Sequence, residues 1–163
     1  MAKSRKKISM ANYICTVIMF VTVIGVIVGL FVDYVGVTVS GGIGELSGSH
    51  TEFVKLFDME DTWGTLSIVA AIATAVFCAL GFVLSLLKNM GGKRFGSAPM
   101  IVGAITVLLA IFAIVCVFVY GGEYSGSVGG NVISAGVKVA PAFGAWLLAA
   151  CGVISGIASV RDK

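Results

Sequence analysis

The side chains best suited to acid–base or metal chemistry gather in one stretch, SHTEFVKLFDMEDTW, from Ser49 to Trp63. It contains the only histidine, His50, and a carboxylate cluster at Asp58, Glu60 and Asp61. That cluster could bind calcium weakly, but it lacks the spacing of an EF-hand loop. The chain also lacks G-x-S-x-G, H-E-x-x-H and phosphate-loop motifs. We therefore expect no catalytic residue, no metal site and no cofactor, which makes the protein non-enzymatic.

The cysteines are the remaining candidates for metal or redox chemistry. They stand far apart in the chain and form no C-x-x-C pair, so neither a zinc site nor a redox motif is expected. The four residues are Cys15, Cys78, Cys116 and Cys151. Each falls in a different apolar run, which predicts small packing residues and no disulfide outside the membrane.

Those apolar runs determine the fold class. The chain is 58% hydrophobic and 12% charged, whereas soluble domains carry about 25% charged residues. About 20 apolar residues span a bilayer as a helix, because the backbone must satisfy its own hydrogen bonds in lipid. The sequence thus predicts an all-α membrane protein, a four-transmembrane-helix bundle in one domain (1–163). The predicted helices are 13–32, 65–87, 100–120 and 142–160.

Orientation follows from the basic residues, which concentrate in cytoplasmic segments of membrane proteins. Nine of the 11 lie before the first helix, between the second and third, or after the fourth. They are Lys3, Arg5, Lys6, Lys7, Lys88, Lys93, Arg94, Arg161 and Lys163. We therefore expect both termini and loop 88–99 in the cytoplasm, and loops 33–64 and 121–141 outside a plasma or bacterial cytoplasmic membrane. The net charge of +3 then reflects anchoring to the lipid bilayer, and no nucleic-acid partner is needed to explain it.

Small residues recur at four-residue spacing in three of the predicted helices. Such faces allow close helix approach in lipid. The predicted packing residues are Gly25, Gly29, Ala71, Ala75, Ala79, Gly152 and Gly156. These faces could join helices within one chain, which is the commoner use, or between chains. Hydroxyl side chains in the same runs, such as Thr22 and Thr74, are expected to bond to the backbone of their own helix or to a neighbour.

The first outer loop predicts a strand followed by a short helix. Residues 35–39 alternate valine with small or polar residues, and Gly41–Gly42 predicts a turn that ends the strand. Ser49 and Glu52 fit a capping box, which predicts a helix through Asp58. Its apolar face would hold Phe53, Leu56 and Phe57, which together with Trp63 at the entry to the second membrane helix are the predicted extracellular interaction residues.

The second outer loop predicts one further strand. Ile133, Ala135, Val137 and Val139 alternate with other residues, and this strand could pair with residues 35–39 to form a small outer sheet. Prolines are expected to begin membrane helices three and four, at Pro99 and Pro141. Aromatic residues are expected near the outer headgroups. These are Tyr34, Trp63, Tyr120 and Trp146.

This layout resembles the claudin-like four-helix superfamily. The features in common are four membrane helices with both ends inside, a longer first outer loop, a strand after the first helix, and a strand running into the fourth through VKVAPAFGAWL. The resemblance implies a helical bundle with a small extracellular sheet and a short helix. The cysteine pair of that family's first loop is absent here, so the resemblance does not extend to a paracellular junction function.

The sequence favours a scaffold or accessory subunit that associates through helix faces and an extracellular cap. We expect a homo-oligomer or a larger membrane complex. A coupled transporter is disfavoured because the apolar runs hold no ionisable residue. The alternative is a subunit of an oligomeric channel or pore, built between chains and lined by backbone, hydroxyls or apolar gates.

Overall fold

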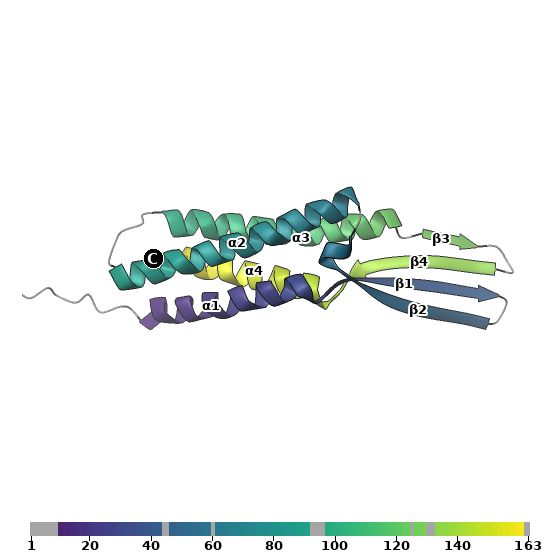
Figure 1. Cartoon of the computed structure of the whole chain (residues 1–163), viewed down its shortest axis with the longest axis horizontal. Helices are drawn as coiled ribbons and strands as arrows, with labels where there is room; N and C mark the ends of the chain where they lie inside the picture. Colours follow the sequence, from purple (N-terminus) through teal and green to yellow (C-terminus); the bar gives the residue numbers. More distant parts are fainter. Residues whose placement is uncertain are drawn as a thin grey trace, which may run out of the picture.

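The computed structural model describes residues 10–43, 46–59, 61–91, 97–124, 126–129 and 133–161. Within this part of the chain, four long helices lie side by side, and a four-stranded sheet continues their long axis beyond one end (Figure 1). The helices are α1 (Met10–Phe31), α2 (Thr62–Gly91), α3 (Ala98–Tyr124) and α4 (Phe143–Arg161). The strands are β1 (Asp33–Ile43), β2 (Leu46–Lys55), β3 (Gly126–Gly129) and β4 (Ile133–Pro141), and a single 3-10 turn, η1 (Leu56–Asp58), follows β2.

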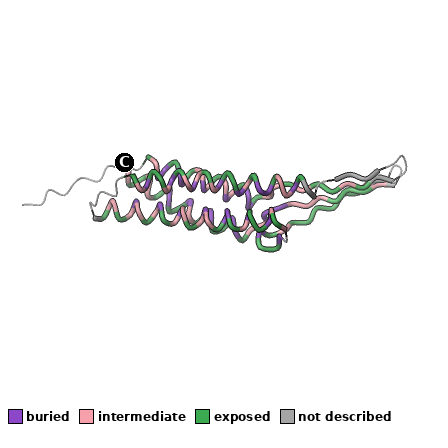
Figure 2. The backbone as a smooth tube through the Cα atoms, turned by 90° about the horizontal axis from the view of Figure 1, so that it is seen from above, coloured by how far each residue is buried: buried purple, intermediate pink, exposed green. Residues whose placement is uncertain are grey.

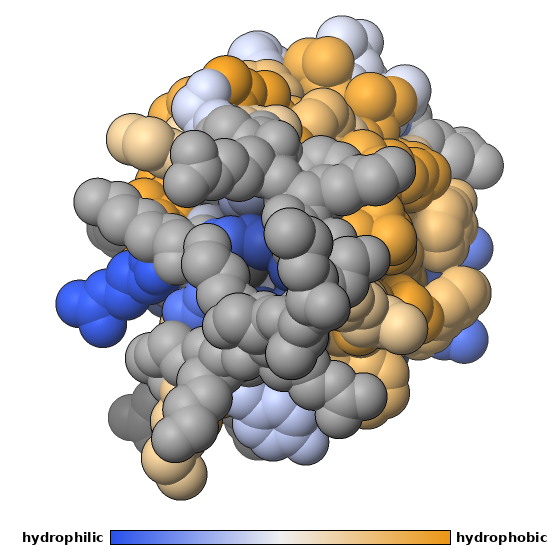
Figure 3. Space-filling view, turned by 90° about the vertical axis from the view of Figure 1, so that its left-hand side faces the viewer, coloured by the Kyte–Doolittle hydropathy of each residue, from blue (hydrophilic) through white to orange (hydrophobic). Residues whose placement is uncertain are grey.

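All four helices in the described part are long and apolar enough to cross a membrane, as the sequence predicted. The spans are Asn12–Phe31, Thr62–Met90, Ala98–Gly122 and Phe143–Arg161. Their outward side chains are large and apolar: Val21 is 60% exposed, Leu108 67% and Phe143 67%. Seen from the end opposite the sheet, orange apolar side chains cover much of the flank of the bundle (Figure 3). This surface suits contact with lipid, in which apolar side chains carry no exposure cost.

The helices surround one narrow apolar interior. Helix α1 packs on α4 and on α2, and α3 packs on the same two helices, which closes the bundle. Met19, Val26, Val117 and Leu148 are fully buried between them. The buried residues form the inner stripes of the helices in Figure 2. Among the strand residues whose burial the structure describes, the buried ones are Tyr34 and Val35, where β1 meets the bundle.

The sheet is antiparallel throughout, with the strand order β2-β1-β4-β3. Strand β1 runs away from the bundle as the continuation of α1, and β4 runs back into α4 (Figure 1). Val37 lies opposite Val139, and Val39 opposite Val137. The predicted pairing of residues 35–39 with the strand before the fourth helix is therefore confirmed.

The predicted helix from Thr51 to Asp58, with Ser49 as its N-cap, is wrong for most of its length. Residues 46–55 form β2, in which Ser49 lies opposite Ser40 and Glu52 opposite Val37, so neither residue belongs to a capping box. Only Leu56–Asp58 turn helically, as η1. The physical reason is that β1 offers a full edge of hydrogen-bonding groups, and a strand at 46–55 satisfies them where a detached helix would not.

Two smaller expectations also need correction, and one strand was not expected. Gly41 and Gly42 do not end the first strand, because they pair on both sides and β1 continues to Ile43. Pro141 is the last residue of β4, and α4 begins at Phe143. The short strand β3 was not predicted, since its glycine- and serine-rich sequence has no apolar alternation. Pro99 does lie in the first turn of α3, as expected.

Candidate functional site

The titratable residues predicted as candidates for chemistry do not converge on a site. His50 and Glu52 lie on β2 with their side chains 3.7 Å apart, but they are 80% and 78% exposed. Asp58 is exposed in η1, and Glu60 lies outside the described residues. Among the described residues, no group of three or more His, Cys, Asp or Glu could hold a metal ion.

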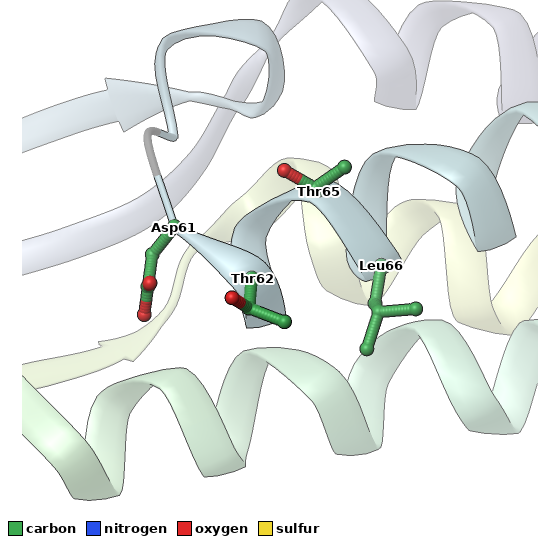
Figure 4. A pocket seen from close by; sticks show the side chains of 4 residues that line it. All are labelled: Asp61, Thr62, Thr65 and Leu66. Atoms are coloured by element: carbon green, nitrogen blue, oxygen red, sulfur yellow. The ribbon is translucent and has the colours of Figure 1, made fainter.

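A depression of about 530 Å³ opens beside the start of α2. Its lining consists of Asp61, Thr62, Thr65 and Leu66, all from one turn and a half of the same segment (Figure 4). The Asp61 carbonyl is already used, because it accepts a 2.7 Å hydrogen bond from the backbone of Thr65. One carboxylate and two hydroxyls from a single helix start provide no opposed groups to hold or activate a substrate.

The predicted packing glycines lie at helix contacts within the chain. A Cβ atom at Gly25 would be 2.5 Å from Cys151 Sγ, and one at Gly29 would be 3.1 Å from the carbonyl oxygen of Gly144. Both contacts join α1 to α4. Glycine at these positions leaves room for the Cys151 side chain and for the close approach of the α4 backbone at Gly144.

On the other side of α4, the glycines meet α2 and α3. A Cβ at Gly152 would lie 2.7 Å from Ala110 Cβ and 3.0 Å from Thr74 Cγ2. A Cβ at Gly156 would lie 2.6 Å from the carbonyl oxygen of Gly103. Gly103 was missed as a packing residue, although a lone glycine inside a helical pattern commonly marks a packing contact.

The alanine stripe of α2 also faces inward. Ala71 is fully buried in the apolar core, and Ala75 packs against that core while partly buried. Ala79 is half-buried. Since both glycine stripes and most of the alanine stripe are used within one chain, the helices leave large apolar side chains for contact with lipid.

Buried hydroxyls inside the bundle have partners, as the sequence led us to expect. Thr22 donates to the Met19 carbonyl at 2.9 Å, and Thr74 to the Ala70 carbonyl at 2.8 Å. Other hydroxyls connect helices. Ser159 in α4 donates to the Pro99 carbonyl of α3 at 2.7 Å. Thr22 and Thr74 are thus buried in the bundle, each bonded to a carbonyl of its own helix.

A second set of polar side chains connects α1 and α2 near the end opposite the sheet. Asn89 Nδ2 donates to Thr16 Oγ1 at 2.8 Å, and Thr16 Oγ1 lies 2.7 Å from Ser85 Oγ. Ser85 is fully buried. This contact joins the helix pair α1–α2, whose packing is sparser than that of α1 with α4.

The junction between bundle and sheet is built around Tyr34. It was expected at the headgroups, but its side chain is fully buried, together with Leu56 from η1. Its phenol oxygen lies 3.4 Å from Ser67 Oγ in α2. Burial raises the pKa of Tyr34, and the hydrogen bond with Ser67 offsets part of that rise. The arrangement connects β1, η1 and α2 in one contact, which orients the sheet on the bundle.

The predicted extracellular interaction residues do not share a face. Leu56 is fully buried, whereas Phe53 is 60% exposed on β2 and Phe57 is 49% exposed in η1. Phe53 lies over Gly36 of β1. The ring of Phe57 is tilted by 41° against that of Phe31 at the end of α1, with the ring centroids 6.2 Å apart. Trp63 is half-buried as the second residue of α2. All four residues lie near the junction between bundle and sheet. None of them lies on the outer half of the sheet.

The outer half of the sheet carries exposed side chains on both faces. Beyond the junction it is a single layer, seen face-on in Figure 1 and from the side in Figure 2. One face carries the valines of β1 and β4, of which Val39 is 52% and Val137 37% exposed, together with His50 and Glu52 of β2. The opposite face carries hydroxyls, such as the Thr38–Thr51 pair at 3.0 Å. Six successive residues of the edge strand β2, 48–53, are all exposed.

No protein-family model, curated protein or solved structure matches this chain. The resemblance to the claudin-like superfamily therefore stays a prediction from architecture.

Proposed function

We propose that this protein is a non-enzymatic membrane scaffold or accessory subunit that associates with further copies of itself or with a partner through its projecting sheet. The observation that carries this proposal is the sheet itself. It extends beyond the bundle as a single layer, with valines exposed on one face and residues 48–53 of the edge strand β2 exposed. A bare sheet edge is a template for pairing with another chain, and exposed apolar faces typically mark interaction surfaces.

The packing of the helices also supports association through the sheet. Their small-residue stripes are occupied within the chain, so the close contacts that drive helix association in lipid are already made. Association through helix faces, which the sequence also favoured, would have to use large lipid-facing side chains. We therefore assign the sheet the larger part in association.

The test is the native mass of the protein solubilised in mild detergent from its host membrane. We expect a multiple of the chain mass, or one chain bound to a co-purifying protein. A second preparation in lipid nanodiscs checks that detergent has not separated the subunits. A single unaccompanied chain in both preparations would contradict the proposal.

A further inference from the structure

The two edges of the sheet differ in length, and neither has a further strand paired to it in the described part of the chain. In the order β2-β1-β4-β3, each outer strand has one paired neighbour in the described part of the chain. Strand β2 is ten residues long and contains no proline. Its lysine is its last residue, at the junction, so the outer part lacks the prolines and lysines that usually block edge pairing. This edge can accept a further strand.

Strand direction makes the two edges complementary. Strands β1 and β3 run away from the bundle, and β2 and β4 run back to it (Figure 1). Two copies in one membrane point the same way, so a β2 edge placed beside the β3 edge of the next copy is antiparallel. The alternation of directions then continues without a break. Two β2 edges in the same membrane would instead be parallel, a less stable pairing per residue.

The two edges also lie at the same level. Ser49 on β2 is opposite Ser40, Ser40 is opposite Gly136, and Gly136 is opposite Ser127 on β3. Copies related by rotation about an axis normal to the membrane keep their levels. Such a rotation brings Ser49 of one copy to the level of Ser127 in the next.

The width of the sheet also matches the width of the helix bundle. Four strands about 4.8 Å apart give a sheet roughly 19 Å wide. A bundle two helices across, with axes 8–10 Å apart and each helix about 10 Å in diameter, is roughly 20 Å wide. Bundles that touch in the membrane therefore bring neighbouring sheet edges to about one strand spacing.

We propose that β2 of one copy pairs antiparallel with β3 of the next copy in the same membrane, forming a continuous intermolecular sheet. The contact is head-to-tail, so it repeats and builds rings or rows. This inference rests on the proposed function and names its partner, a second copy of this chain.

The experiment is disulfide cross-linking of Ser49→Cys/Ser127→Cys in native membranes, with a membrane-impermeant oxidant. Within one chain these positions are three strands apart, roughly 14 Å, and a disulfide needs Cα atoms about 4.4–6.8 Å apart. Any new cross-link is therefore between chains. The four native cysteines all lie in the helices, and the unaltered chain measures their background. Ser40→Cys/Ser127→Cys is the matched control, because Ser40 is at the same level but in a central strand.

We expect a ladder of covalent dimers, trimers and higher species from the double variant, at least tenfold above the matched control. Each single variant should give background only, and a mixture of Ser49→Cys chains with Ser127→Cys chains should stop at dimers. An oligomeric native mass without the ladder would overturn this inference while the proposed function stands. Strong dimers from Ser49→Cys alone would also overturn it, and a monomeric native mass would overturn both.

Discussion

At the scale of single residues, the tightest contacts involve glycines that a sequence motif locates only in part. Gly156→Ala would place a Cβ 2.5 Å from Val107 Cγ2 and 2.6 Å from the Gly103 carbonyl oxygen. A backbone carbonyl cannot move aside as a side chain does, so α3 and α4 must separate. We expect a loss of about 1–3 kcal/mol of stability, read as a lower thermal unfolding midpoint in detergent.

Gly122→Ala is the control for that substitution. It is also a helical glycine of α3, but a Cβ there meets nothing within 4 Å. Because alanine favours helix over glycine by about 0.5–1 kcal/mol, this variant should be unchanged or slightly more stable. Equal unfolding midpoints for the two variants would contradict the assigned α3–α4 contact.

Tyr34 makes a second residue-scale prediction, which concerns pH. Its pKa is raised above the ordinary value of 10.0 by burial. The folded state therefore favours the neutral phenol. The contribution of neutral Tyr34 to the free energy of unfolding is complete below pH 10 and is lost as pH rises through the pKa of the folded state. Tyr34→Phe should cost about 1 kcal/mol at neutral pH through the lost hydrogen bond with Ser67.

The difference between Tyr34→Phe and the unaltered protein should then shrink above pH 10 and reverse at higher pH, because phenylalanine cannot ionise. Urea unfolding at a series of pH values measures this difference. A stability gap that stays constant from neutral to strongly alkaline pH would show that the pKa of Tyr34 is the same in the folded and unfolded protein, which would contradict the raised pKa.

At the scale of elements, the polar contact between α1 and α2 carries a prediction of its own. Thr16→Val removes the oxygen that Asn89 and Ser85 both contact. Hydrogen bonds between membrane helices are worth about 0.6 kcal/mol on average and up to roughly 1.7 kcal/mol. We expect a loss in that range, with Thr16→Ser restoring most of it. The thermal unfolding midpoints of Thr16→Val and Thr16→Ser, measured side by side, check this. Equal midpoints would show that the hydroxyl of residue 16 does not stabilise the contact between α1 and α2.

The strand identity of β2 is open to a direct check. Thr38 and Thr51 face each other with their hydroxyls 3.0 Å apart, so Thr38→Cys/Thr51→Cys should form a disulfide within one chain. Thr38→Cys/Glu52→Cys should not, because Glu52 points to the opposite face of the sheet. Cross-linking in the second pair and not the first would favour a different register.

These elements show how far the sequence could predict the fold. The four helices were predictable because a bilayer-length apolar run has one way to satisfy its backbone. The pairing of β1 with β4 was predictable because valine alternation is visible in both strands. Strand β2 was not, since Ser49 and Glu52 fit a helix start locally while the pairing that overrides it comes from a different segment. The contact of Gly103 with Gly156 also joins segments far apart in the chain, and single-helix spacing does not show it.

At the scale of the whole molecule, the structure separates two ends that the charge pattern assigns to opposite sides of a membrane. Lys88 and Arg161 lie at the end where α2 and α4 finish, whereas Glu52 lies on the sheet. Lys55 and Lys138 are the two of the 11 basic residues that fall on the sheet side. Basic residues favour the cytoplasmic side, and the predicted outer segments hold most of the carboxylates. We therefore expect the sheet outside the cell, where its edges can meet those of neighbouring copies.

Cysteine accessibility in intact cells tests that orientation. Met90 is 82% exposed near the end of α2, and Gly48 is exposed on β2 with nothing near its Cβ position. A membrane-impermeant thiol reagent should label Gly48→Cys in intact cells, and Met90→Cys only after permeabilisation. Labelling of both in intact cells would contradict the four-span arrangement. Labelling of Met90→Cys but not Gly48→Cys in intact cells would show that the sheet faces the cytoplasm. The intermolecular pairing of β2 with β3 would then have to form in the cytoplasm.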